Sequence, residues 1–85
     1  MTEIKCEVRP VLALFADEME KVLKANDYKG GWDSSHCSCG FLEDRLIQEL
    51  GEYFKSRDVK ELCDIANFAM MLWSRRKGMP VPILC

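Results

Sequence analysis

The sequence has no long apolar run, no surplus of basic charge, and no repeat or low-complexity segment. Its longest mainly apolar stretch covers residues 62–73, which are interrupted by Asp64 and Asn67 and are too few to span a membrane as a helix. The formal net charge is −2, and the basic residues are scattered apart from a short run at residues 75–77 that suits the end of a helix. This charge distribution argues against a surface for a nucleic-acid polymer. Residues 1–8 carry three charges and no apolar core, so we expect no secretory signal.

Familiar catalytic motifs are missing as well, since there is no glycine-rich phosphate loop and no nucleophile elbow. The five cysteines are an odd number and, without an export signal, are most simply reduced thiols of a cytoplasmic protein. The segment His36-Cys37-Ser38-Cys39 is a soft-metal candidate, but structural zinc needs four ligands, commonly from two pairs, and no second pair exists. We interpret it as a polar loop with incidental thiols; a small zinc-stabilised adaptor is the alternative.

At 85 residues the chain is a single small domain, and a chain of this size buries only about 60–65% of its unfolded surface. We therefore expect a partner subunit. Sequence patterns predict helices at about residues 10–25, 41–55 and 58–77, a loop at 26–40 and an extended tail at 79–85. The predicted fold class is all-α, with antiparallel helical hairpins that complete a four-helix-bundle-type core by homo-oligomerisation.

The second and third predicted helices carry the most informative patterns. Glu49 falls inside the apolar stripe of the second helix, about 20° from Leu42 on a helical wheel. A carboxylate in a core-facing stripe is costly unless something compensates its charge. The third helix is apolar on nearly every side, which predicts burial by a second subunit, and Asp58 with Glu61 fits an N-terminal capping box.

Two acidic pairs lie on these helices at a spacing of three residues, Glu49 with Glu52 and Glu61 with Asp64. Residues three apart are neighbours on a helix, about 60° apart around the axis. Two antiparallel helices would aim all four carboxylates at one point, where like charges repel and lose hydration unless a cation lies between them. Oxygen ligands favour Mg²⁺ or Mn²⁺ over Zn²⁺. The pattern therefore predicts a magnesium site, with manganese possible.

Each acid also has a plainer interpretation. Glu49 can pair with Arg45, Glu52 can be solvated, and Glu61 can cap a helix. Asp64 is the hardest to explain in this way because it lies in an otherwise apolar helix. The four acids together favour the metal interpretation, because independent surface acids need not fall beside core stripes on consecutive helices.

The order Glu-x-x-Glu, short spacer, Glu-x-x-Asp resembles the signature of MazG-like nucleotide pyrophosphohydrolases, within the all-α NTP pyrophosphatase superfamily. The resemblance runs over residues 23–73 and includes Lys29-Gly-Gly-Trp32 and Asp64-Ile-Ala-Asn67-Phe-Ala-Met-Met71. It implies a homodimer or a dimer of dimers that hydrolyses a nucleoside triphosphate to a monophosphate and pyrophosphate. It also implies Mg²⁺ on the acids that match the family's metal ligands, which are Glu49, Glu52, Glu61 and Asp64.

Substrate-binding candidates lie in the same resembling segment. Lys29 can meet a phosphate, because the glycines after it allow a close backbone approach, and Trp32 can stack on a base. Asn67 can hydrogen-bond to a base or sugar, and Lys24 and Asn26 complete the set. The plainer interpretation is a turn with a solvated lysine and a tryptophan that covers the core.

Glu52 is the predicted catalytic residue, because an acid that the metal does not fully engage can orient the attacking water. An alternative from another class is a non-catalytic helical dimer whose acids only bind metal or cap helices. The sequence leaves the identity of the nucleotide open.

Overall fold

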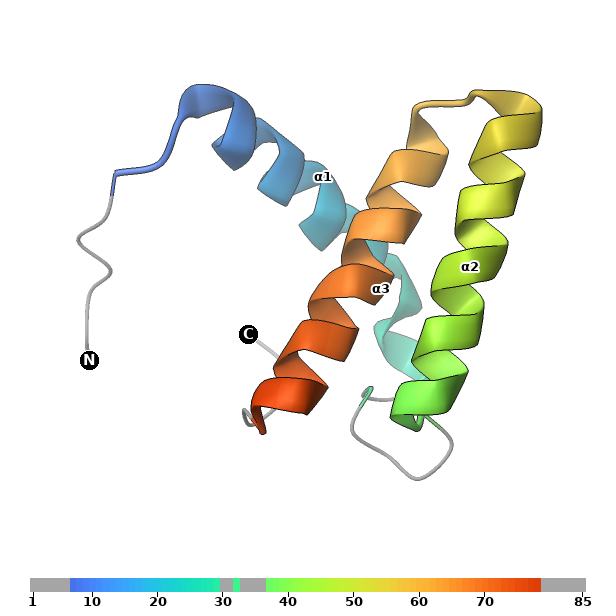
Figure 1. Ribbon diagram of the computed structural model, residues 1–85. Coiled ribbons are helices and arrows are strands. Elements are labelled where there is room, and N and C mark those ends of the chain that lie inside the picture. Colours follow the sequence, from blue (N-terminus) through green and yellow to red (C-terminus); the bar gives the residue numbers. More distant parts are fainter. Residues whose placement is uncertain (1–6, 30–31, 33–36, 79–85) are drawn as a thin grey trace.

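The computed structural model describes residues 7–29, 32 and 37–78. Within these residues the chain forms three α-helices and one short 3₁₀ turn, and it contains no strand. The elements in chain order are α1 (Pro10–Asn26), η1 (Asp27–Lys29), α2 (Cys39–Ser56) and α3 (Lys60–Lys77) (Figure 1). The all-α prediction is confirmed, whereas the predicted tail at 79–85 lies outside the described residues. No helix in the described part is long and apolar enough to cross a membrane.

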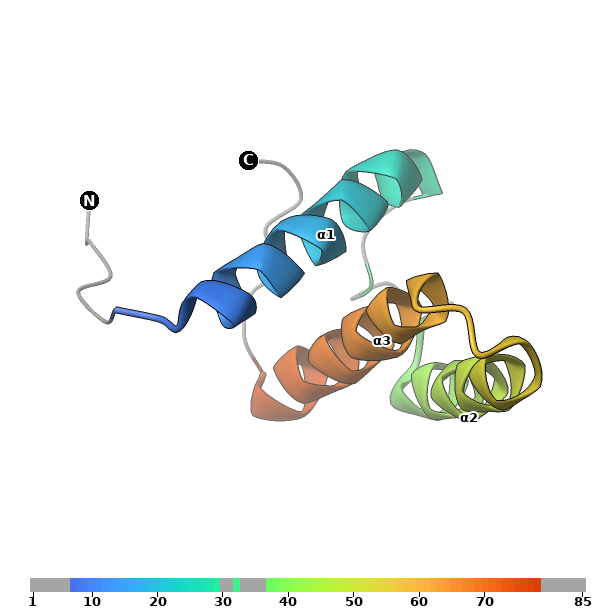
Figure 2. The same ribbon diagram turned by 90° about the horizontal axis from the view of Figure 1, so that it is seen from above.

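The helices form an antiparallel hairpin with a third helix laid across it. α2 and α3 run side by side in opposite directions, joined by a short connection at residues 57–59 (Figure 1). α1 crosses one face of the hairpin as a separate layer and makes its helix contacts with α3 (Figure 2). This arrangement brings one face of the hairpin under α1.

α1 is attached to the hairpin by only part of its length. It begins at Pro10, whose fixed φ suits a first helical turn, and ends within one residue of the predicted boundary. It has no buried residue, although Met19, Val22 and Leu23 near its C-terminal end are half-buried. Its first half leaves four large apolar side chains exposed, which are Val11, Leu12, Leu14 and Phe15.

Local capping explains where the two hairpin helices begin. The Ser38 side chain accepts a hydrogen bond from Phe41 N at 3.1 Å, so α2 begins at Cys39, slightly before its predicted start. The predicted capping box at Asp58 is wrong, because Asp58 N donates to Ser56 Oγ at 3.0 Å and not to the Glu61 side chain. Asp58 Oδ1 instead accepts a hydrogen bond from the backbone N–H of Lys60, the first residue of α3, at 2.9 Å.

The interior of the described residues is small and mostly polar. Leu42 is the one buried large apolar side chain in this part of the protein, and the other buried residues are Glu49, Asn67 and Ser74. All four belong to the hairpin. Burying a polar group costs free energy unless it finds a partner. The hairpin thus buries polar side chains at positions where a small domain would ordinarily bury apolar ones.

Candidate functional site

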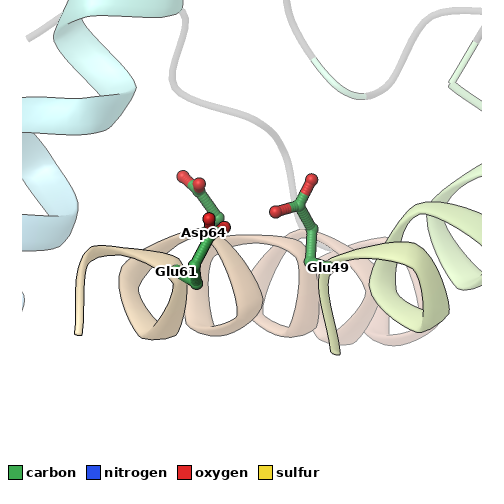
Figure 3. A group of neighbouring side chains, drawn as sticks. All are labelled: Glu49, Glu61 and Asp64. Atoms are coloured by element: carbon green, nitrogen blue, oxygen red, sulfur yellow. The ribbon is translucent and has the colours of Figure 1, made fainter. Parts of the chain in front are cut away.

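Three carboxylates meet between α2 and α3. Glu49 comes from α2, and Glu61 and Asp64 come from adjacent positions on one face of α3. One oxygen atom of each residue lies within 4.8 Å of an oxygen of the other two. Figure 3 shows the three side chains extending from the same side of the hairpin. Glu49 is buried and the other two acids are half-buried, so the group is partly withdrawn from water.

The electrostatics of this cluster disfavour ionised acids. Burial and then the negative charges of Glu52 and Asp64 raise the pKa of Glu49, against an opposing effect from Arg45. Burial and the charge of Glu52 also raise the pKa of Asp64, again opposed by Arg45. Both carboxylates are therefore costly to ionise in the metal-free protein. A divalent cation between them would remove much of that cost.

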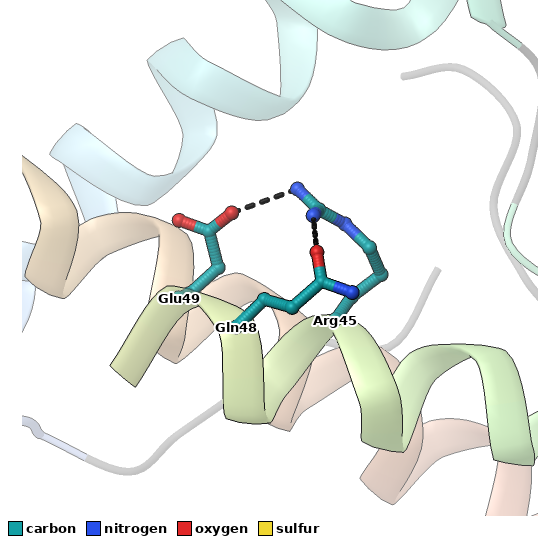
Figure 4. Close-up of polar contacts among 3 residues, drawn as sticks. All are labelled: Arg45, Gln48 and Glu49. Atoms are coloured by element: carbon teal, nitrogen blue, oxygen red, sulfur yellow. Dashed lines mark hydrogen bonds and ion pairs between the residues drawn. The ribbon is translucent and has the colours of Figure 1, made fainter. Parts of the chain in front are cut away.

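Arg45 partly compensates the cluster. Its Nη2 donates to Glu49 Oε2 at 2.7 Å, and its Nη1 donates to Gln48 Oε1 at 2.5 Å (Figure 4). The guanidinium carbon also lies 5.2 Å from the centroid of the Phe68 ring. The other oxygen, Glu49 Oε1, is buried and has no hydrogen-bond partner among the described residues. The ion pair that the sequence allows is thus present, but it satisfies only half of the carboxylate.

Glu52 lies outside the group of three. It is exposed, although its charge acts on Glu49 and Asp64. Its oxygens are not among those of Glu49, Glu61 and Asp64 that lie within 4.8 Å of one another. The structure therefore brings together three of the four predicted ligands and leaves the fourth beside them.

A cleft of about 650 Å³ opens next to the cluster. Glu49 and Asp64 form part of its wall, so the acids and the cleft share a boundary. The remaining wall is mainly apolar and aromatic, with contributions from Val22, Leu23, Asn26, Trp32, Cys37, Phe41, Leu42, Arg45, Asn67, Phe68 and Met71. Such a space suits a flat organic group that lies beside a charged one.

Asn67 is one of the polar groups on this wall. It is only 3% exposed, and its Nδ2 donates to the backbone oxygen of Met19 at 3.3 Å. Turning the amide over would place two acceptors against each other, which fixes its orientation. Asn67 Oδ1 is buried and has no hydrogen-bond partner among the described residues. It is an acceptor in need of a donor.

Trp32 also lines the cleft and is fastened to α3. Its indole Nε1 donates to Ser74 Oγ at 2.8 Å, and Arg75 Nη1 donates to its backbone oxygen at 2.7 Å. The same Arg75 nitrogen donates to the backbone oxygen of Cys37. α3 therefore holds the chain on both sides of residues 33–36. The sequence alone does not predict this role of Arg75, because basic residues are common in the last turn of a helix.

The other predicted substrate-binding residues are less engaged. Asn26 lines the cleft, but its Nδ2 donates to the oxygen of Val22 in its own helix at 2.9 Å. Lys24 is exposed and does not line the cleft. Lys29 belongs to η1, and its side chain lies outside what the structure describes.

The soft-metal segment can be assessed only in part. His36 lies outside the described residues, and Cys37 and Cys39 are half-buried free thiols. Within the described ranges, the acidic cluster is the one group that brings three potential metal ligands together.

Comparisons with protein-family models, with curated proteins and with solved structures return no match for this chain.

Proposed function

We propose that the protein is a Mg²⁺-dependent nucleoside triphosphate pyrophosphohydrolase that acts as a homo-oligomer. The observation that carries the proposal is the buried, unpartnered oxygen of Glu49 in a group of three carboxylates, two of which, Glu49 and Asp64, line an aromatic cleft. A buried carboxylate oxygen without a donor is costly, and a metal ion is the partner that its neighbours also need.

The residues fit a magnesium ion. Every donor in the cluster is a carboxylate oxygen, which suits Mg²⁺ or Mn²⁺ better than Zn²⁺. Glu49, Glu61 and Asp64 would hold the ion, and Glu52 lies close enough for its charge to contribute. When bound, Mg²⁺ supplies charge neutralisation at the phosphates and activation of water.

Residues in the cleft would contact the base and sugar, and residues at its edge would contact the phosphates and orient the attacking water. Trp32 and Phe68 offer aromatic surfaces to a base, and Asn67 Oδ1 offers an acceptor to a base or sugar N–H or O–H group. Lys24 and Lys29 are the proposed phosphate contacts. Glu52, exposed beside the cluster, is the acid that would orient the attacking water.

Self-association completes the proposal. Besides the exposed half of α1, the hairpin leaves large apolar side chains uncovered, which are Phe41, Ile47, Leu50, Phe54, Leu62 and Trp73. Apolar surface of this extent on a small chain is typical of an interface. We infer that two hairpins pack together into a four-helix-bundle-type core.

A non-catalytic metal-binding dimer is the second candidate. One observation favours it: Glu52 lies outside the group of three, where it contributes charge but no ligand oxygen. Screening pyrophosphate release over a panel of ribo- and deoxynucleoside triphosphates, with Mg²⁺ and with Mn²⁺, separates the two. Release that disappears in Glu61→Gln but persists in Asp44→Asn, an exposed control on α2, supports the enzyme. A parent protein that binds Mg²⁺ and releases no pyrophosphate from any nucleotide supports the non-catalytic dimer.

A further inference from the structure

Arg45 stands where the cluster and the cleft meet. It lines the cleft, and it is the one cation among the described residues that do so. Its Nη2 donates to Glu49 Oε2 at 2.7 Å while its guanidinium carbon lies 5.2 Å from the centre of the Phe68 ring. One side chain therefore touches an acid of the cluster and an aromatic surface of the cleft.

Arg45 and a divalent cation would compete for the same carboxylate. The Arg45 side chain is 32% exposed, whereas the Glu49 side chain is 6% exposed. When a divalent cation binds Glu49, the buried Glu49 side chain has little room to move. The Arg45 side chain is partly exposed and can move toward solvent. Two positive groups on one carboxylate also repel each other. Release of the guanidinium is the movement that the burial pattern allows.

A freed guanidinium at this position has a chemical use. A phosphate group beside the acids would bring negative charge to a wall that already holds Glu49 and Asp64. Arginine presents its N–H groups as a planar fork that matches phosphate oxygens. A cation–π contact with the Phe68 ring would keep the released Arg45 guanidinium inside the cleft.

We propose that Arg45 is the resident counter-ion of the metal-free site, that the divalent cation displaces it from Glu49, and that the released guanidinium then binds a phosphate of the ligand. The proposal rests on the proposed function, because it assumes metal on Glu49 and a phosphate-bearing ligand. It adds an order of events, with metal before phosphate, and it assigns Arg45 a role that the acidic motif does not contain.

Opposite changes in two affinities follow from this role. Without Arg45, Mg²⁺ meets no competitor, so Arg45→Gln should bind Mg²⁺ about threefold more tightly than the parent. The same variant lacks a charged phosphate contact, so in saturating Mg²⁺ it should bind inorganic pyrophosphate about tenfold more weakly. A purely structural arginine would weaken both or change neither.

Calorimetric titration of the full chain with Mg²⁺, and then with inorganic pyrophosphate in excess Mg²⁺, measures both affinities. Mildly alkaline buffer keeps protons from competing for the acids. Lys55→Gln makes the same change of charge at an exposed position of α2 and should match the parent. Arg45→Lys keeps the charge but loses the fork, so it should hold Mg²⁺ like the parent and pyrophosphate less well. It also provides the test if circular dichroism finds that Arg45→Gln has lost its helices.

The outcomes separate this proposal from the proposed function. If the parent binds Mg²⁺ but Arg45→Gln binds it no more tightly, or if pyrophosphate affinity is unchanged, the role of Arg45 is refuted while the metal site stands. If neither the parent nor any variant binds Mg²⁺ or Mn²⁺, the proposed function fails and the role of Arg45 fails with it.

Discussion

The hairpin of α2 and α3 and the helix α1 differ in what they bury. All four buried residues of the described chain, Leu42, Glu49, Asn67 and Ser74, lie in the hairpin, whereas α1 buries none. Three of those four are polar, and two of the three carry an oxygen with no hydrogen-bond partner among the described residues. The hairpin thus buries polar groups, and α1 supplies apolar surface that its own chain only partly covers.

This difference shows where binding partners should act. If the proposed function holds, a bound cation or hydrogen-bond donor would offset the cost of the polar groups that the hairpin buries without partners. Under the proposed self-association, another chain would cover the apolar side chains that α1 and the outer hairpin surface leave in water. Three predictions test this division, beginning with the largest effect.

Asp64→Ala should abolish Mg²⁺-dependent turnover while the helices remain. Substitution of the outer partners of metal ligands already costs about 10–100-fold, so loss of a ligand should cost at least about a hundredfold. The metal-free variant should be no less stable than the parent, because one of several mutually repelling carboxylates is gone. Pyrophosphate-release kinetics and chemical denaturation measure the two effects. Loss of helical structure would instead make Asp64 a structural residue.

Ile47→Asp should weaken self-association by about tenfold or more, because Ile47 is 67% exposed on α2 and a charge there would have to be desolvated in an interface. Sedimentation at micromolar concentration should give the parent a mass above that of the 9.8 kDa monomer. Lys55→Asp, at an exposed polar position on the same helix, is the control. A parent that sediments as a compact monomer would contradict the division between the two regions.

The smallest effect concerns pH. An acid whose pKa is raised by folding binds more protons in the native state than in the unfolded state, so stability falls as pH rises from its ordinary pKa to the raised value. Glu49 and Asp64 are such acids, so without metal they should favour the fold at mildly acidic over neutral pH. Glu49→Gln should flatten this dependence. Urea unfolding in the presence of a chelator at several pH values measures the free energy of unfolding of the parent and of Glu49→Gln. Identical pH profiles for the two proteins would count against a raised pKa of Glu49 in the folded state.

Most of the fold was predictable from the sequence because it depends on local periodicity. The three helices follow their apolar patterns, and the boundaries shift only where short-range hydrogen bonds at Ser38 and Asp58 decide the first turn. The self-association that the apolar third helix predicts stays a prediction, because a single chain holds no partner.

The site was predictable in part. Spacing along each helix, together with the antiparallel pairing of the two helices, is enough to predict that Glu49, Glu61 and Asp64 come together. It does not reveal that Glu52 stays outside the group, because Glu61 and Asp64 have the same spacing of three and do come together. The attachment of Trp32 to Ser74 joins residues 42 positions apart and depends on how the chain returns to α3, which no local pattern encodes.

The central claim, that the hairpin is built around a divalent cation, is tested most directly by thermal unfolding with and without metal. Millimolar Mg²⁺ or Mn²⁺ should raise the melting temperature, with a stabilisation of about 2.7 kcal/mol at a hundredfold excess over Kd. The gain should shrink in Glu49→Gln, because the amide keeps the shape and loses the charge, and it should persist in Asp44→Asn. Melting curves that Mg²⁺ and Mn²⁺ leave unmoved, while Zn²⁺ shifts them strongly, would contradict the account and favour a zinc-stabilised adaptor.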